Sequence, residues 1–210
     1  IMNNLQSIVS HFNTKGTVNE IQPLGSGLIN DTYKVTTLEA DAPDYVLQRV
    51  NHAIFQNVEM LQANIEAVTR HIRKKLVEQG ADDIDRKVLS FIPADTGKTY
   101  WYDGENYWRI MTFIPNAKTY ETVDAEYSYY AGVAFGNFQA MLADIPDELG
   151  ETIPDFHNME FRLKQLRDAV AADAVGRVKE VQYYLDEIEK RAEEMCKGER
   201  LHHEGKLPKR

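Results

Sequence analysis

Two closely spaced glycines, Gly25 and Gly27, lie between two runs of residues that are typical of β-strands. Glycine allows positive φ angles and a close approach of the backbone to a ligand, and the N–H groups of such a turn form a concavity that binds anions. Asn30 follows, and asparagine tolerates the left-handed conformation better than most residues. The pattern indicates either a phosphate-binding loop, with contacts from Gly25, Ser26, Gly27 and Asn30, or a plain hairpin with a glycine-rich turn.

A cation, Arg49, lies in the next predicted strand. A guanidinium can bind two phosphate oxygens at once, so Arg49 is a second candidate for phosphate binding. A carboxylate on the helix that follows could orient it; Glu59 and Glu66 are the candidates, and Glu66 is favoured because it lies nearer the middle of the helix. The alternation of the strand does not settle which face is buried, and a solvated arginine is the alternative.

Transfer of a phosphoryl group requires more than a site for the phosphates. It needs a residue that positions or deprotonates the acceptor hydroxyl, and carboxylates that hold Mg²⁺. After Ile114 the sequence contains single acidic residues but no His-x-Asp-x-x-x-x-Asn loop, and His157, His202 and His203 are more typical of structural or surface residues. We therefore assign no catalytic residue and no metal ligand within this chain.

Hydrophobic periodicity predicts the elements that would position these residues. A short amphipathic helix opens the chain, and three strands cover residues 18–24, 32–37 and 45–50. A long helix begins at about Asn57, a good N-cap residue, and ends at Gly80. Three further strands are predicted at residues 88–92, 98–102 and 106–114, with hairpin turn residues between the last two pairs.

After Pro115 the pattern is helical only. Helices are predicted at about residues 124–143, 159–171 and 173–195, and the last is either a core helix or part of a coiled coil. Strands followed by helices indicate an α+β chain with two lobes. The predicted domains are therefore residues 1–114 and residues 115–210.

The composition limits the classes of protein. A net charge of −9 disfavours non-specific nucleic-acid binding, which needs a basic surface. The single cysteine, Cys196, cannot form an internal disulfide, which favours a reducing cytoplasm. No apolar run approaches the roughly 20 residues that span a bilayer, so no membrane partner is expected.

Several segments together resemble the aminoglycoside phosphotransferase and choline kinase superfamily, and within it bacterial N-acetylhexosamine 1-kinases most. These segments are Gly-Ser-Gly-Leu-Ile-Asn-Asp-Thr-Tyr at residues 25–33, Tyr-Val-Leu-Gln-Arg-Val-Asn at 45–51, and residues 108–114, 134–139 and 151–157. The resemblance implies a protein-kinase-like small lobe, an antiparallel sheet with one long helix, followed by the first helices of a helical large lobe. It further implies ATP and Mg²⁺ as cofactors, phosphorylation of a small sugar at its anomeric hydroxyl, and Asp31 and Thr32 as candidate substrate contacts.

The same resemblance places two motifs after the last residue, Arg210. They are a His-Asn-Asp-Thr-Lys motif with the catalytic aspartate, and a later metal-binding aspartate. We therefore expect the chain by itself to be inactive and, because it would expose helix faces meant for the missing part, to self-associate. The alternatives are a kinase-like module that binds without transfer, or a kinase for choline, homoserine or methylthioribose.

Overall fold

The structure is a computed structural model that describes residues 2–25 and 27–207. The chain forms two compact units, Ile1–Thr152 and Ile153–Arg210, and each is described here by itself. The division into lobes after residue 114 remains a prediction. None of the helices in the described ranges is long and apolar enough to cross a membrane.

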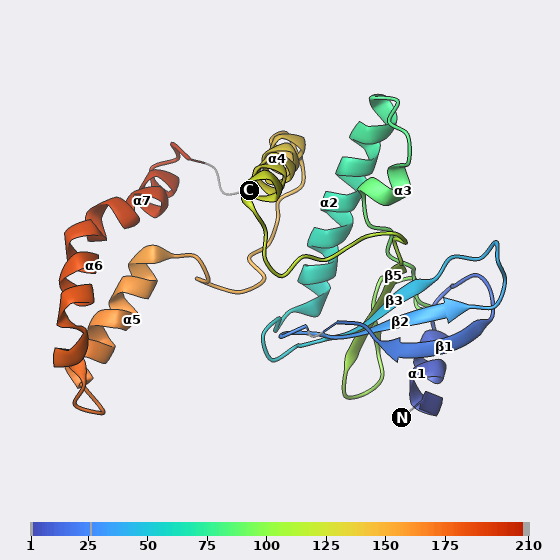
Figure 1. Cartoon of the computed structure of the whole chain (residues 1–210), viewed down its shortest axis with the longest axis horizontal. Helices are drawn as coiled ribbons and strands as arrows, with labels where there is room; N and C mark the ends of the chain where they lie inside the picture. The colour runs from blue at the N-terminus through green and yellow to red at the C-terminus, as the bar shows by residue number, and fades with distance from the viewer. Residues whose placement is uncertain (1, 26, 208–210) are drawn as a thin grey trace. The chain divides into compact units, whose positions relative to one another are not determined.

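The first unit is built on a five-stranded sheet in the order β1-β2-β3-β5-β4, in which all neighbours are antiparallel (Figure 1). With the helices beside it, the sheet confirms the α+β class and the kinase-like small lobe followed by helices. The strands are β1 (Val18–Pro23), β2 (Asp31–Thr37), β3 (Tyr45–Val50), β4 (Trp101–Tyr102) and β5 (Tyr107–Thr112).

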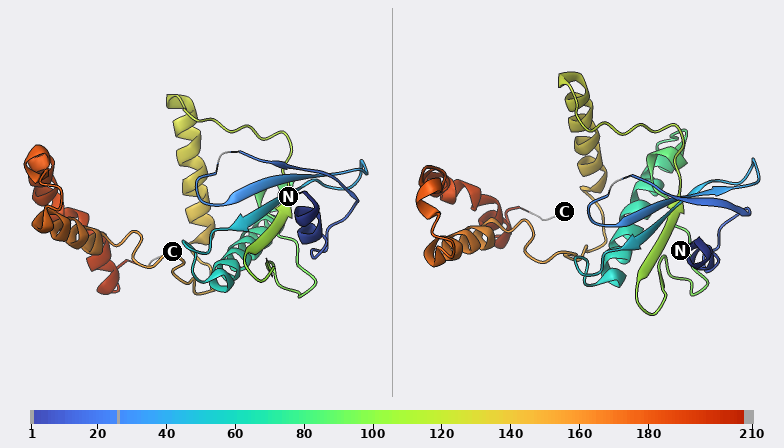
Figure 2. Two further views of the ribbon diagram at one scale, coloured as in Figure 1. Left: turned by 90° about the horizontal axis from the view of Figure 1, so that it is seen from below. Right: turned by 60° about the horizontal axis from the view of Figure 1, so that its bottom comes forward.

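Helices cover both faces of this sheet (Figure 2). On one face, α1 (Met2–Val9) packs its apolar side chains against alternate residues of the strands, among them Tyr45, Leu47 and Trp108. On the other face lies α2 (Val58–Glu78), which begins at the predicted N-cap, where the Asn57 side chain accepts a hydrogen bond of 2.9 Å from the Met60 N–H. Since successive side chains of a strand point to opposite faces, each strand residue belongs either to the α1 face or to the α2 face.

The buried side of α2 differs in part from the predicted apolar stripe. Val58, Ile72 and Leu76 are buried as expected, whereas the predicted Leu61, Ile65 and Val68 are only partly buried. Gln62 is the most buried of the α2 side chains described, with 1% of its surface exposed. A buried amide needs hydrogen-bond partners, and those of Gln62 belong to the candidate site below.

The prediction of a strand at residues 88–92 is wrong. A short helix, α3 (Ile84–Lys87), precedes the segment, and the segment itself forms only an isolated bridge between Phe91 and Met111. The reason is where β5 ends. Ile92 and Ser90 form backbone hydrogen bonds with Ile110 and Thr112, the last residues of β5, so Val88 and Leu89 have no partner residue within this strand. β4 pairs with the first residues of β5 and is shorter than predicted.

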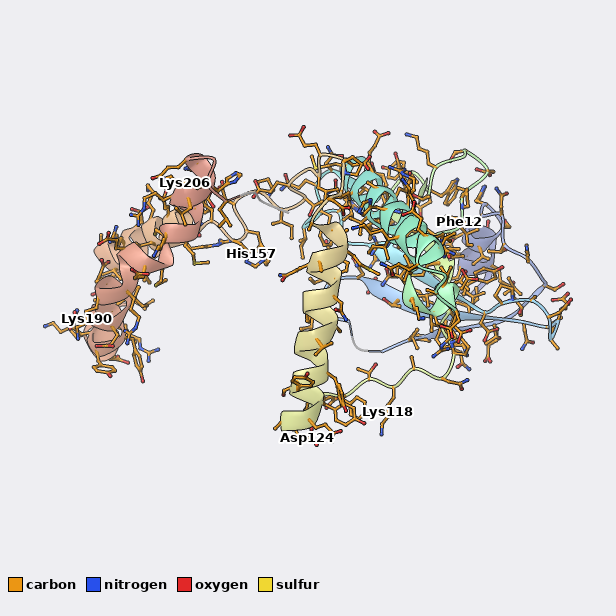
Figure 3. The ribbon with its side chains drawn as sticks, turned by 90° about the horizontal axis from the view of Figure 1, so that it is seen from above. Phe12, Lys118, Asp124, His157, Lys190 and Lys206 are labelled. Atoms are coloured by element: carbon orange, nitrogen blue, oxygen red, sulfur yellow. The ribbon has the colours of Figure 1, made fainter. Side chains whose placement is uncertain are left out.

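The helix α4 (Ala125–Leu142) begins after Asp124, which Figure 3 labels. The Asp124 side chain accepts a hydrogen bond of 2.9 Å from the Tyr127 N–H. Its C-terminal end is attached to α2, because Lys75 and His71 both contact the Met141 carbonyl oxygen and the Asp144 carboxylate. α4 thus lies beside the α2 face of the sheet.

The second unit contains α5 (Met159–Ala172), the 3-10 turn η1 (Val178–Val181), α6 (Gln182–Met195) and α7 (Lys197–His203). The single helix predicted at residues 173–195 begins later than expected. Asp173 and Gly176 have positive φ angles of 36° and 69°, which are incompatible with a right-handed helix. α5 and α6 are joined by an ion pair between Arg167 and Glu189 with two hydrogen bonds.

Candidate functional site

The glycine-rich segment is the turn between β1 and β2, as predicted. Gly25 has a φ of +72°, a conformation that L side chains rarely adopt. A Cβ at Gly27 would lie 3.1 Å from the Asn30 carbonyl oxygen, so a side chain there would crowd the turn. Ser26, which was also predicted to contact phosphate, lies outside the described residues.

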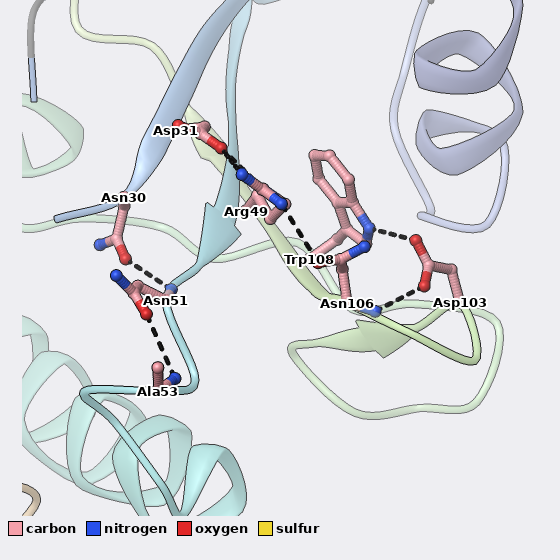
Figure 4. Close-up of polar contacts among 8 residues, drawn as sticks. All are labelled: Asn30, Asp31, Arg49, Asn51, Ala53, Asp103, Asn106 and Trp108. Atoms are coloured by element: carbon pink, nitrogen blue, oxygen red, sulfur yellow. Dashed lines mark hydrogen bonds and ion pairs between the residues drawn. The ribbon is translucent and has the colours of Figure 1, made fainter.

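Asn30 attaches the end of this turn to the end of β3. Its side-chain oxygen accepts a hydrogen bond of 3.0 Å from the Asn51 N–H (Figure 4). The Asn51 side chain in turn accepts one of 3.2 Å from the Ala53 N–H. The turn is therefore held by a side-chain contact that does not depend on any ligand.

Arg49 contacts two side chains, one on the neighbouring strand β2 and one in the turn before β5 (Figure 4). Its guanidinium forms an ion pair with Asp31, with a hydrogen bond of 2.6 Å from Nε, and donates a 3.3 Å bond to Asn106. Asp31 and Arg49 are directly opposite in the β2–β3 register, where opposite charges stabilise each other. Asp31 thus neutralises the cation that was predicted to bind phosphate.

The cavity beside Arg49, of about 440 Å³, lies on the α1 face. Three carboxylates line it, those of Asp31, Asp103 and Glu105, and Arg49 is the cation among its lining residues. Phosphate groups carry negative charge, and like charges repel. This cavity is therefore poorly suited to a nucleotide.

Asp103 organises the hairpin between β4 and β5. Its carboxylate accepts hydrogen bonds from the N–H groups of Glu105 and Asn106 and a 2.7 Å bond from the Trp108 indole N–H. Burial would raise the pKa of Asp103, but these hydrogen bonds outweigh it and hold the pKa below the ordinary value of 3.8. The ionised carboxylate therefore stabilises this hairpin.

Acid is expected to loosen the hairpin through Asp103. Because its pKa is lowered on folding, the stabilisation is complete above about pH 4 and is lost as the pH falls through the lowered pKa. The indole N–H resonance of Trp108 should shift below pH 4. In Asp103→Asn that shift should be absent, and an unchanged titration in this variant would contradict the assignment.

Glu66 does not contact Arg49 within the described residues. Its carboxylate accepts a hydrogen bond from the Thr99 hydroxyl. The predicted pairing fails because Arg49 follows Tyr45 and Leu47 on the α1 face, whereas α2 covers the opposite face. The strand residue that faces α2 is its neighbour, Gln48.

The α2 face holds a different arginine, Arg109 of β5. Its Nε donates a 3.0 Å hydrogen bond to the Gln48 side-chain oxygen, and its guanidinium donates another of 3.0 Å to the Gln62 oxygen. Gln48 donates to the Thr32 hydroxyl, and Gln62 to the hydroxyl and carbonyl oxygens of Thr99. One network thus connects Thr32, at the end of the glycine turn, with Glu66 through Thr99.

Arg109 has no carboxylate within ion-pair distance in the part of the chain that the structure describes. Burial of the guanidinium lowers its pKa to about 10, so it stays charged at neutral pH. Arg109 is part-buried, and a cation without a counterion in such a position is costly and is a common feature of binding sites. The signal in the sequence was a lone charge between the apolar Trp108 and Ile110 of a predicted strand.

Arg109 lines a cavity of about 580 Å³ on the α2 face, which is a usual size for a small-molecule site. Its charged lining residues are Arg109 and Lys87, both cations, of which Lys87 is paired with Asp82. The remaining walls are mostly apolar and come from α2, β5, α4 and the segment that follows α3. The cavity thus combines positive charge with an apolar surface, which suits an anionic ligand that also carries an apolar group.

Comparison with protein families agrees with this geometry. The family model of the phosphotransferase enzyme family matches residues 20–207, from the strand before the glycine-rich turn to the end of the described residues. The match includes the sheet apart from the first residues of β1, and the helices from α2 onward, but not α1. The chain therefore belongs to the phosphotransferase enzyme family.

Proposed function

We propose that the protein is an ATP-dependent kinase that phosphorylates an N-acetylhexosamine at its anomeric hydroxyl. The observation that carries the proposal is the turn at Gly25–Asn30, built on a positive φ and fixed by Asn30 to the end of β3, in a chain of the phosphotransferase family. The choice of sugar rests on the resemblance of residues 25–33 and 45–51 to the hexosamine kinases.

In this proposal the backbone N–H groups of Gly25, Ser26 and Gly27 bind the phosphates of ATP, as in other glycine-rich anion sites. The Thr32 carbonyl oxygen accepts a hydrogen bond from the N–H of Leu24, the residue before the turn. The Thr32 hydroxyl keeps a hydrogen to donate, because it accepts its bond from Gln48. We do not extend the phosphate-binding role to Arg49 or a substrate contact to Asp31, because these two residues neutralise each other.

Mg²⁺ would neutralise the phosphates as they bind. Within residues 2–25 and 27–207, no group of three histidine, cysteine, aspartate or glutamate side chains lies together that could hold a metal ion. We therefore assign no Mg²⁺ ligands and derive no step through the metal.

The test is an assay of the protein at its natural length with Mg-ATP, measuring ADP release and sugar 1-phosphate. N-acetylglucosamine or N-acetylgalactosamine is expected to stimulate ADP release, whereas choline, homoserine and methylthioribose are not. Stimulation by one of these three alcohols would move the proposal to that substrate. Binding of ATP without transfer to any acceptor would instead support the non-catalytic module, which the lack of an acceptor-activating motif in residues 1–210 favours.

Self-association also remains a proposal. It is supported by the exposed aromatic side chains of α4, of which Tyr129 and Phe135 are 69% and 70% exposed. Light scattering that shows a strict monomer at all concentrations would contradict it.

A further inference from the structure

We propose that Arg109 is the cation that binds the phosphates of the nucleotide, in the cavity on the α2 face of the sheet. The inference rests on the proposed function and deepens it, since it assigns the phosphate-binding side chain to β5 rather than to β3. Four observations carry it: the position of Arg109 in the sheet, its unused donors, the charge of its cavity and the network that holds it.

The position follows from the strand register. Thr32 is opposite Gln48, and Gln48 is opposite Arg109, so the three residues form one row across β2, β3 and β5. Neighbouring strands are about 4.8 Å apart, which places the Arg109 backbone about 10 Å from Thr32. A triphosphate that contacts the turn at Gly25–Asn30 could therefore extend along this row toward the guanidinium.

The guanidinium of Arg109 has unused hydrogen-bond donors. It carries five N–H groups, of which Gln48 and Gln62 accept one each. The other three have no hydrogen-bond acceptor within the described ranges of the chain. A ligand with several oxygens would satisfy them and supply the negative charge that no carboxylate of the described residues provides.

The two cavities beside the sheet differ in charge. The cavity on the α1 face has three carboxylates against Arg49, whereas the lining of that on the α2 face holds no carboxylate and two cations, Arg109 and Lys87. Of these two, Lys87 is paired with Asp82 outside the lining, so Arg109 carries the free positive charge. Apolar side chains, among them Val68, Met111 and Phe138, line the rest of the α2-face cavity. A nucleotide has both properties that this cavity can bind, an anionic chain and a flat apolar base.

The network holds the guanidinium in place before a ligand arrives. Gln62 is buried and fixed by two hydrogen bonds of 3.1 Å to Thr99, and Thr99 is fixed in turn by Glu66. The guanidinium also lies over the Phe91 ring, 5.6 Å from its centroid. Glu66, predicted to orient an arginine, is thus a positioning residue for Arg109 through two intermediates rather than by direct contact.

The test compares ATP, AMP and adenosine by isothermal titration calorimetry. In the wild-type protein, ATP should bind more tightly than adenosine. Arg109→Gln removes the charge-assisted bonds to phosphate and should weaken ATP binding about 10- to 100-fold, while the affinity for adenosine changes less than about threefold, since the base binds elsewhere in the cavity. Arg49→Gln, on the opposite face, is the matched control and should leave both affinities within about threefold.

A second variant keeps the test valid if Arg109→Gln does not fold. Circular dichroism would detect such misfolding. Arg109→Lys keeps the charge but not the planar fork, so ATP binding should fall less than in Arg109→Gln, with adenosine again unaffected.

The outcomes separate the two proposals. If the wild-type protein binds no ATP, the proposed function fails. If the wild-type protein binds ATP, three results would each show that the assignment of Arg109 is wrong while the proposed function stands. The Arg109 variants bind ATP with unchanged affinity, or they lose affinity for ATP and adenosine equally. The third result is a selective loss of ATP affinity in Arg49→Gln.

Discussion

Replacing Gln62 by leucine is expected to destabilise the protein by about 2–4 kcal/mol, because each buried polar group left without a partner costs about 1–3 kcal/mol. Leucine has a similar size, so the change removes hydrogen bonds rather than volume. It leaves one N–H of the Arg109 guanidinium and the Thr99 carbonyl oxygen without the partner that Gln62 provides. Urea unfolding followed by circular dichroism measures the loss.

The double variant Gln62→Leu with Arg109→Met is the control for this explanation. When both partners of a buried polar pair become apolar, the cost is much smaller than when one partner is left behind. The double variant should therefore be more stable than the sum of the two single losses predicts, by about 1 kcal/mol or more. Simple additivity would show that the two side chains do not stabilise each other.

Gly16→Ala is expected to cost about 2–5 kcal/mol, from a strained backbone and an overpacked contact. Gly16 connects α1 to β1 with a φ of +82°. An added Cβ would lie 2.6 Å from the Ala42 Cβ and 2.9 Å from a Glu39 carboxylate oxygen. That carboxylate also accepts hydrogen bonds from the Thr17 N–H and hydroxyl, so the turn cannot move away freely.

Gly97→Ala is the matched control for Gly16→Ala. Gly97 has nearly the same φ, +79°, but an added Cβ would meet nothing within 4 Å. It should therefore cost only the backbone strain, about 1–2 kcal/mol. Equal losses in the two variants, measured by urea unfolding, would show that the contact with Ala42 is not tight.

The elements that sequence reasoning predicted correctly are those fixed by local signals. The strand at residues 45–50 has the predicted bounds, and the α2 and α4 helices begin directly after the cap residues Asn57 and Asp124. The strand at residues 88–92 could not be excluded in this way. The outcome depends on the partner strand, because Phe91 is opposite Met111 and β5 ends at Thr112, so the first residues of the segment have no partner in β5. This register is not visible in the segment alone.

In the candidate site too, local sequence predicts the turn but not the long-range strand pairing. The glycine-rich turn was predictable, because the conformation it needs is a property of the glycines themselves. The arginine was not, because the alternation of a strand shows that Gln48 and Arg49 point to opposite faces but not which face α2 covers. Only the pairing of β3 with β5 brings Arg109 beside Gln48, and these two residues are far apart in the sequence.

An NMR titration with Mg-ATP locates the nucleotide without any substitution. Binding on the α2 face should shift the backbone amide resonances of Gly25–Thr32, the side-chain amides of Gln48 and Gln62, and the Nε–H of Arg109. Residues of the α1 face, above all Asp103, Asn106 and the Trp108 indole, should shift little. The largest shifts at these α1-face residues, with Arg109 and Gln48 unchanged, would contradict nucleotide binding on the α2 face.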